Sequence, residues 1–202
     1  PDLVVEDGQP RTEFRFSPFT RAIQEENAVI VLDEANRPVP SVMNSLLPLL
    51  DHRRQVSLNG LDEPVEVADG VIFFLTINQG SEYTGTYRHD AALNNRVTMQ
   101  IRMDYLPPEM EAELLAERTR IKTSEAETIA KVAGKLRELA KGDDKVIRQP
   151  VSTRQMIRVS DVVNAGLDLE AAFEAVIGPQ FSMDGGDKSE YATYRQTLQG
   201  YL

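Results

Sequence analysis

Apolar and polar positions divide the chain into a first part that mixes strand and helix patterns and a second part that is helical. Residues 28–32 are an unbroken apolar run rich in β-branched side chains, which is typical of a strand buried on both faces of a parallel sheet, and the second apolar run at residues 71–77 predicts another buried strand. Helices are predicted at residues 19–26 and 41–50. The inward-facing side chains of the second helix are expected to be Val42, Leu46, Leu49 and Leu50.

Three further segments of the first part show weaker strand patterns. Residues 1–18 are predicted to form a polar loop that leads into a short strand. Residues 55–58 and 64–67 alternate around an Asn-Gly pair at positions 59 and 60, which predicts a β-hairpin. Residues 97–103 also alternate and are expected to form a third strand of the body.

The strand patterns stop at a Leu-Pro-Pro sequence, residues 106–108. Helical periodicity follows at residues 109–122, 124–141, 152–165 and 169–177. The predicted architecture is therefore an α/β body with a parallel sheet at residues 1–105, followed by an all-helical domain at residues 106–202.

Composition restricts the class of protein. The 202 residues include no cysteine, which excludes disulfide scaffolds, thiolate metal sites and cysteine nucleophiles. A net charge of −10 opposes general nucleic-acid binding, and no apolar run approaches the roughly 20 residues of a membrane span. We expect a cytoplasmic protein with no membrane partner and no general affinity for nucleic acid.

Polar side chains follow both apolar runs. Asp33 and Glu34 come directly after the first run, and Asn78 comes directly after the second. Ligands of open α/β sheets bind at the carboxyl ends of the strands, and nucleotide hydrolysis uses one carboxylate for the magnesium shell and a neighbouring group for the attacking water. Taken alone, the acidic pair fits equally well a role in capping the next helix or facing solvent.

Several segments, in the same order, resemble the motifs of MoxR-like, dynein-related AAA+ ATPases. Residues 29–37, Val-Ile-Val-Leu-Asp-Glu-Ala-Asn-Arg, are similar to the Walker B region of that family. Thr76-Ile77-Asn78 resembles its sensor 1 strand, and the segments at residues 83–86 and 92–97 resemble its arginine-finger region. Residues 104–109 with Glu113 are similar to the start of its helical lid, and Ser152-Thr153-Arg154 matches its sensor 2 position. The branch with rubisco-activating and nitric-oxide-reductase-maturing ATPases is the most similar.

The resemblance implies ATP and Mg²⁺ as ligands and a role for each of five residues. Asp33 would hold Mg²⁺ through water, Glu34 would polarise the attacking water, Asn78 would orient that water, Arg96 would act as an arginine finger on a neighbouring subunit, and Arg154 would contact the γ-phosphate. Plainer alternatives stay open for three of them. Asn78 could be a turn residue, Arg96 a surface arginine paired with Asp90 or Asp104, and Arg154 an exposed residue at a helix start.

The resemblance also implies a ring of subunits, expected to be a hexamer, that remodels a target protein or enzyme complex, together with a possible partner carrying a von Willebrand A-type domain. The hairpin around residues 59–60 would then face the pore, although a simple surface hairpin fits equally well. A different class of protein, a catalytically inactive AAA+-like scaffold, is the alternative. Retention of the five site residues disfavours that alternative.

Two features depart from the family pattern. The sequence contains no loop of the form G-x-x-x-x-G-K-[ST], whose backbone amides would hold the phosphates. Together with the start at Pro1, this predicts an N-terminal truncation, weak nucleotide binding by the fragment itself, and apolar faces of the remaining strands left uncovered. The second departure is Gln79, which stands where the relatives carry proline after the sensor asparagine.

Overall fold

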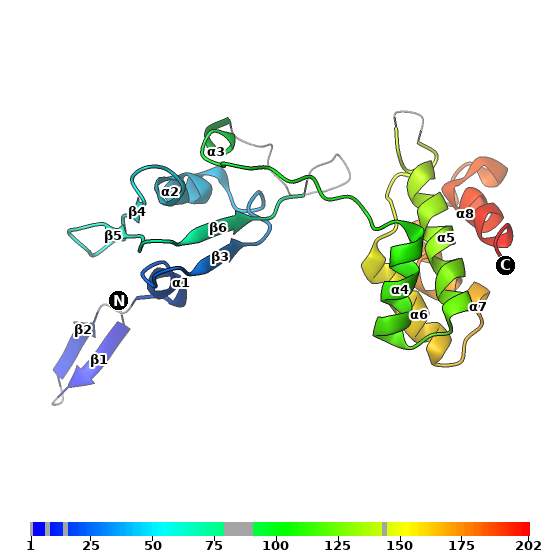
Figure 1. Ribbon diagram of the computed structural model, residues 1–202, viewed down its shortest axis with the longest axis horizontal. Coiled ribbons are helices and arrows are strands. Elements are labelled where there is room, and N and C mark those ends of the chain that lie inside the picture. Colours follow the sequence, from blue (N-terminus) through cyan, green and yellow to red (C-terminus); the bar gives the residue numbers. More distant parts are fainter. Residues whose placement is uncertain (1, 7–8, 14–15, 79–90, 143–144) are drawn as a thin grey trace. The chain divides into compact units, whose positions relative to one another are not determined.

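The computed structural model describes residues 2–6, 9–13, 16–78, 91–142 and 145–202. These residues form two compact units, Pro1–Ile101 and Arg102–Leu202 (Figure 1). The first unit mixes strands and helices, and the described part of the second contains helices, turns and loops. The predicted α/β class with a parallel sheet and a following helical lid is therefore confirmed.

A parallel pair of strands lies at the centre of the first unit. Strand β3, Val29–Leu32, pairs with β6, Ile72–Leu75, and Leu32 is the register partner of Leu75 (Figure 1). Both strands fall within the predicted apolar runs. Because the two strands are parallel and in register, their carboxyl ends lie side by side at one edge of the sheet.

Burial of both faces of these strands was predicted, and this prediction is wrong. Ile30 faces the core and is 8% exposed, whereas Val29 and Val31 are 60% and 59% exposed. On β6, Ile72 and Phe74 are likewise 55% and 53% exposed. One face of the pair is thus buried and the other is bare, which agrees with the expectation that apolar faces of the remaining strands lie uncovered.

Two helices contribute to the core on the buried face. Helix α1, Pro18–Ala22, begins at Ser17, whose hydroxyl accepts the Thr20 N–H, and it is shorter than predicted. Helix α2, Pro40–Leu50, matches its predicted range. Its Leu49 is fully buried, but Val42 is 47% exposed, so the prediction that Val42 points inward is wrong. The core cluster of this unit contains Ile23, Ile30, Leu49, Val56, Val65, Val67 and Val71.

The first unit also contains two antiparallel strand pairs. Strands β4, Gln55–Val56, and β5, Val65–Glu66, form the predicted pair, but residues 57–64 connect them, so the Asn-Gly sequence is not a two-residue turn between the strands. Strands β1, Asp2–Glu6, and β2, Gln9–Glu13, form a second hairpin where a loop was predicted. The Asp-Gly sequence between β1 and β2 is a hairpin signal that the sequence interpretation missed.

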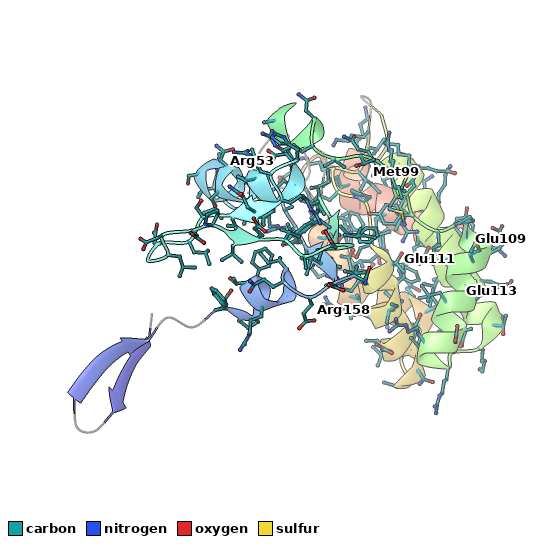
Figure 2. All side chains as sticks on the ribbon, turned by 60° about the vertical axis from the view of Figure 1, so that its left-hand side comes forward. Arg53, Met99, Glu109, Glu111, Glu113 and Arg158 are labelled. Atoms are coloured by element: carbon teal, nitrogen blue, oxygen red, sulfur yellow. The ribbon has the colours of Figure 1, made fainter. Side chains whose placement is uncertain are left out.

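The third strand predicted at residues 97–103 is absent. This segment follows a short helix, α3, Ala91–Asn94, and the structure gives it no helix or strand. Met99, Ile101 and Met103 are 70%, 67% and 83% exposed, and Figure 2 labels Met99 on this segment. The alternating pattern of a strand is present, but in the described residues no neighbouring strand pairs with it.

Helices make up the second unit. Helices α4, Pro108–Thr119, α5, Thr123–Leu139, α6, Thr153–Asn164, and α7, Leu169–Val176, confirm the four predicted helices. Helix α8, Glu190–Gln199, and two short 3₁₀ turns at Gly178–Gln180 and Gly186–Lys188 lie beyond the prediction. No helix of the described ranges is both long enough and apolar enough to cross a membrane.

A buried ion pair crosses the core of this helical unit. The guanidinium of Arg137 on α5 donates to both carboxylate oxygens of Glu111 on α4, at 2.5 and 2.8 Å, and its Nε donates to the Val151 carbonyl at 2.8 Å. Glu111 is fully buried, whereas its neighbours Glu109 and Glu113 are exposed and point away from the bundle (Figure 2). The pair joins α4 and α5 to the loop before α6.

Candidate functional site

The acidic pair at the end of β3 is tied to the end of β6 by the side chain of Thr76. The Glu34 N–H donates to Thr76 Oγ1 at 2.8 Å, and the Thr76 hydroxyl donates to Asp33 Oδ1. A hydroxyl carries a single hydrogen. That hydrogen points to Asp33, and a lone pair of the same oxygen accepts the Glu34 N–H. The Thr76 side chain therefore holds both residues of the acidic pair.

The backbone of Glu34 is held in an unusual conformation. Its φ is +52°, in the left-handed region, which costs a residue with a Cβ about 1–2 kcal/mol. Bonds to Thr76 surround this position. The Thr76 N–H donates to the Leu32 carbonyl at 3.0 Å, and the Ala35 N–H donates to the Thr76 carbonyl at 2.8 Å. The surrounding bonds therefore offset the conformational cost and set the direction in which the Glu34 side chain leaves the chain.

Asn78 is anchored through its main chain. The amide of Asn36 donates from Nδ2 to the Asn78 carbonyl at 2.8 Å and accepts the Asn78 N–H at Oδ1 at 3.4 Å. Asn36 is 8% exposed, so its polar atoms depend on these partners. Both bonds use main-chain atoms of Asn78, and the side-chain amide of Asn78 takes no part in them.

The carboxylate of Glu34 has a partner on its own loop. Arg37 Nε lies 2.9 Å from Glu34 Oε2, and both side chains are 47% exposed. An exposed ion pair of this kind contributes little stability, typically about 0–1 kcal/mol. The pair can therefore open at low cost when another group needs the Glu34 carboxylate.

Arg96 lies in the same unit but bonds to a different carboxylate. Its Nε donates to Asp51 Oδ2 at 3.0 Å, and its Nη1 donates to the Ala92 carbonyl at 2.9 Å. The structure thus gives Arg96 a partner other than the two suggested from the sequence. Asp104 instead lies 3.5 Å from Lys141 in the helical unit, and Asp90 lies outside the described residues.

Asp51 holds two arginines at the end of α2. Arg53 donates from Nε to Asp51 Oδ1 at 3.0 Å and from Nη2 to Oδ2 at 2.7 Å, while Arg96 shares Oδ2. The hydrogen bonds from Arg53, and then the single hydrogen bond from Arg96, hold the pKa of the Asp51 carboxyl well below its usual range, against the opposing effect of desolvation. Asp51 is therefore charged throughout the physiological range and keeps Arg96 in place.

Arg154 belongs to the helical unit. It is the second residue of α6, after a capping box in which Ser152 Oγ accepts the Gln155 N–H at 3.2 Å and Gln155 Oε1 accepts the Ser152 N–H at 2.8 Å. The box fixes the start of the helix, and Arg154 is exposed there. The structure therefore brings Asp33, Glu34 and Asn78 together in the first unit, and it places Arg154 in the other unit.

Thr76, Asn36 and Asp51 contact the predicted site residues, but the sequence pattern gives them no role. Thr76 and Asn36 both lie within segments that resemble motifs of the family. A usable signal existed for Thr76, because a hydroxyl two residues before a strand-end asparagine lies next to the end of the neighbouring parallel strand. No sequence signal connects Asp51 with Arg96, since the two are 45 positions apart.

The acidic pair provides carboxylate oxygens, the ligand type that Mg²⁺ takes in proteins. Asp33 is exposed, and the hydroxyl of Thr76 holds its Oδ1, so its outward oxygen can accept hydrogen bonds from metal-bound water. Within the ranges that the structure describes, no group of three or more acidic or histidine side chains is placed to hold a metal ion. Mg²⁺ in proteins usually keeps several waters and binds through one or two carboxylates together with substrate phosphates.

Two family models match this chain. The AAA domain (dynein-related subfamily) matches residues 3–97, and the CbbQ/NirQ/NorQ C-terminal domain matches residues 111–191. Together they cover the site region and most of the helical unit. The segment between the two matches includes the residues at which the structure divides into its two units.

Curated relatives agree with the two models. BssE of Thauera aromatica, named as a candidate chaperone, is 35% identical over 175 residues, which are 86% of this chain and 58% of that protein. NorQ of Paracoccus denitrificans is 29% identical over 160 residues, which are 79% of this chain and 57% of that protein. An uncharacterized protein of Staphylococcus haemolyticus is 27% identical over 173 residues, 85% of this chain and 64% of that protein.

The chain thus spans somewhat more than half the length of the relatives it matches. The order of the two matching domains is the order of the two structural units, with the strands first and the helices second. The chain therefore belongs to the AAA+ ATPases of the MoxR-like, dynein-related type, with an AAA domain followed by a CbbQ/NirQ/NorQ-type helical domain.

Proposed function

We propose that this chain is part of an ATP-hydrolysing subunit that remodels a protein or an enzyme complex. The observation that carries the proposal is the edge of the β3–β6 pair, where Thr76 and Asn36 join the acidic pair to Asn78. Two carboxylates and an amide at the carboxyl ends of parallel strands are the groups that phosphoryl transfer to water requires.

Asp33 and Glu34 take different roles because their surroundings differ. Asp33 accepts the Thr76 hydroxyl and is the proposed holder of hydrated Mg²⁺, which neutralises phosphate charge when it is bound. Glu34 is the proposed general base. Its only described ionic partner is Arg37 in an exposed pair, so its carboxylate can turn to a water molecule.

Asn78 is proposed to orient the attacking water with its side-chain amide, which can both donate and accept. Asn36 supports this role by holding the Asn78 main chain without using that amide. The water would then lie between an anchored amide and the Glu34 carboxylate. Their joint attachment to one sheet edge favours the fixed geometry that such a reaction needs.

Arg96 is proposed to act on the nucleotide of a neighbouring subunit. Asp51 and the Ala92 carbonyl occupy two of its N–H donors, and a guanidinium has five. The remaining donors can face a phosphate while Asp51 keeps the side chain in position. Arg154, at the fixed start of α6, is proposed to contribute its charge to the γ-phosphate.

The proposed assembly is a homo-oligomeric ring, expected to be a hexamer, that acts on a target protein. Action on a target protein is supported by the relative BssE, which is named as a candidate chaperone. A partner with a von Willebrand A-type domain remains part of the proposal through the family resemblance. The β4–β5 hairpin is the proposed contact with the target.

The test replaces Glu34 by glutamine in the full-length protein. Glu34→Gln keeps the size and hydrogen-bonding shape of the side chain but removes its basicity. General-base catalysis typically contributes about 10²–10⁴-fold, so ATP turnover should fall by at least ~100-fold while ATP binding and ring size are retained. Turnover is measured by phosphate release, nucleotide content by extraction, and ring size by light scattering.

Glu25→Gln is the matched control, because Glu25 is an exposed carboxylate of the same unit and lies outside the site. It should keep the turnover of the unmodified protein. Normal turnover in Glu34→Gln would remove Glu34 from the proposed role. An unmodified full-length protein that neither binds nor hydrolyses ATP would instead favour the inactive scaffold.

A further inference from the structure

Thr76 stands at the centre of the hydrogen bonds around the acidic pair. Its hydroxyl contacts Asp33 and the Glu34 N–H, and its main chain contacts Leu32 and Ala35. These four bonds join β6 to four consecutive residues at the end of β3. No other described side chain bonds to both members of the acidic pair.

The hydroxyl of Thr76 determines which way the Asp33 carboxylate points. A carboxylate on an exposed side chain can otherwise rotate freely, and both oxygens would compete equally for a cation. Donation from Thr76 holds Oδ1 at the end of β6, so the second oxygen, Oδ2, is the one that this bond leaves for a cation. The same hydroxyl accepts the Glu34 N–H at 2.8 Å and supports the left-handed backbone there.

We propose that Thr76 is a positioning residue that orients Asp33 for a hydrated divalent cation and holds Glu34 in its left-handed conformation. The proposal rests on the function proposed above, because it concerns the same acidic pair. Groups that support metal ligands in this way typically change metal affinity or activity by about 10–100-fold when they are removed. A threonine that served only the packing of β6 would have no such effect on a cation.

The test measures how Mg²⁺ strengthens ATP binding, with no hydrolysis in the assay. Full-length Glu34→Gln protein is titrated with ATP at increasing Mg²⁺ by calorimetry, and Thr76→Val is then added to that background. Valine keeps the branched shape and removes the hydroxyl. The Mg²⁺ concentration for half-maximal tightening should rise by about 10-fold, while Thr76→Ser, which keeps the hydroxyl, should restore the original value.

Thr98→Val is the matched control, because Thr98 is an exposed threonine of the same unit and lies outside the site. It also removes a threonine hydroxyl but does not touch Asp33, so it should leave the Mg²⁺ dependence unchanged. An equal shift in Thr98→Val would show that the effect does not depend on the bond to Asp33 and would overturn the positioning role. Circular dichroism confirms folding of each variant, and Thr76→Ala replaces Thr76→Val if the valine variant does not fold.

The experiment distinguishes a failure of the proposed function from a failure of the role proposed for Thr76. If the Glu34→Gln protein does not bind ATP with Mg²⁺, the proposed function fails and Thr76 has no cation to serve. If that protein binds ATP with Mg²⁺ and Thr76→Val leaves the Mg²⁺ dependence unchanged, the proposed function stands and the role of Thr76 is wrong. A serine variant that behaves like the valine variant would also overturn it, because the hydroxyl would then not be the cause.

Discussion

Arg96 is held in place by a carboxylate of its own unit. Asp51 receives Arg53 and Arg96 together, and its side chain is 12% exposed. Because the pKa of Asp51 is lowered in the folded protein, its favourable contribution is complete above the unfolded pKa near 3.8. That contribution is lost only as the pH falls through the still lower folded value, so Arg96 stays held at any pH used for an assay.

We predict that Asp51→Asn lowers ATP turnover of the full-length protein by about 10- to 100-fold through misplacement of Arg96. The amide cannot neutralise two guanidinium groups, although it keeps the shape of the side chain. The decrease should be the same from pH 5 to pH 8, since the Asp51 carboxyl of the unmodified protein does not titrate there. Steady-state turnover across this range is the measurement.

Asp69→Asn is the control for this experiment, because Asp69 is an exposed aspartate of the same unit. It should leave turnover unchanged. If Asp51→Asn has normal turnover, or loses turnover only near pH 5, then Asp51 does not position Arg96 in the proposed way.

The candidate site was predictable in part at this scale. Asp33, Glu34 and Asn78 could be found because each directly follows an apolar strand, and parallel strands bring such ends together. Thr76 and Asn36 carry the contacts that join these ends, but a motif names residues and does not say which atoms bond. The partner of Arg96 depends on how α2 ends, which the sequence pattern of the helix leaves open.

Among the elements, helices were predicted more accurately than strands for a physical reason. A helix satisfies its backbone within itself, so the ranges of α2, α4, α5, α6 and α7 follow from local periodicity. A strand satisfies its backbone hydrogen bonds only by pairing with a neighbouring strand. The segment at residues 97–103 has the alternating pattern of a strand, but no strand of the described residues pairs with it.

The same dependence explains the bare face of β3 and β6. Their continuous apolar runs carry the pattern of strands covered on both sides, yet Val31 and Phe74 are more than half exposed. The apolar pattern of β3 and β6 is thus that of a sheet covered on both faces, whereas the described residues cover only one face. Soluble proteins rarely leave large contiguous apolar patches of this kind exposed to solvent.

The buried pair between α4 and α5 permits a prediction on stability. Glu111→Leu would leave the Arg137 guanidinium, which is 4% exposed, without its carboxylate. Removing one partner of a buried ion pair typically costs about 3–5 kcal/mol. We therefore expect the helical unit to unfold at clearly lower urea concentration, as measured on the whole chain by circular dichroism at 222 nm, a wavelength that reports roughly the helix content.

Lys135→Ala provides the comparison, since Lys135 and Glu138 form an exposed ion pair on α5 with their atoms 3.0 Å apart. It should change stability by less than about 1 kcal/mol. If Glu111→Leu is no more destabilising than Lys135→Ala, the buried pair does not stabilise the helical unit as argued.

At the scale of the whole molecule, each unit carries residues that the proposed function uses. The α/β unit provides Asp33, Glu34, Asn78 and Arg96, and the helical unit provides Arg154 on a helix that a capping box fixes. Each unit has its own hydrophobic cluster, so each can keep its functional side chains in place by its own packing. Under the proposal, hydrolysis also needs Arg96 of a neighbouring subunit, which a single chain cannot supply.

Mixing two inactive variants tests that last requirement. The Glu34→Gln variant lacks the proposed base but keeps Arg96. The Arg96→Ala variant keeps Glu34 but lacks the proposed arginine finger. An arginine finger accelerates phosphoryl transfer by roughly 10³–10⁵-fold in other systems. In a ring of head-to-tail contacts, random co-assembly would give about one quarter of interfaces an intact Glu34 facing an intact Arg96. Co-expressed full-length variants should therefore recover turnover that neither variant has alone. Without recovery in mixed rings, Arg96 would have to act within its own subunit, and the head-to-tail arrangement would lose its catalytic basis.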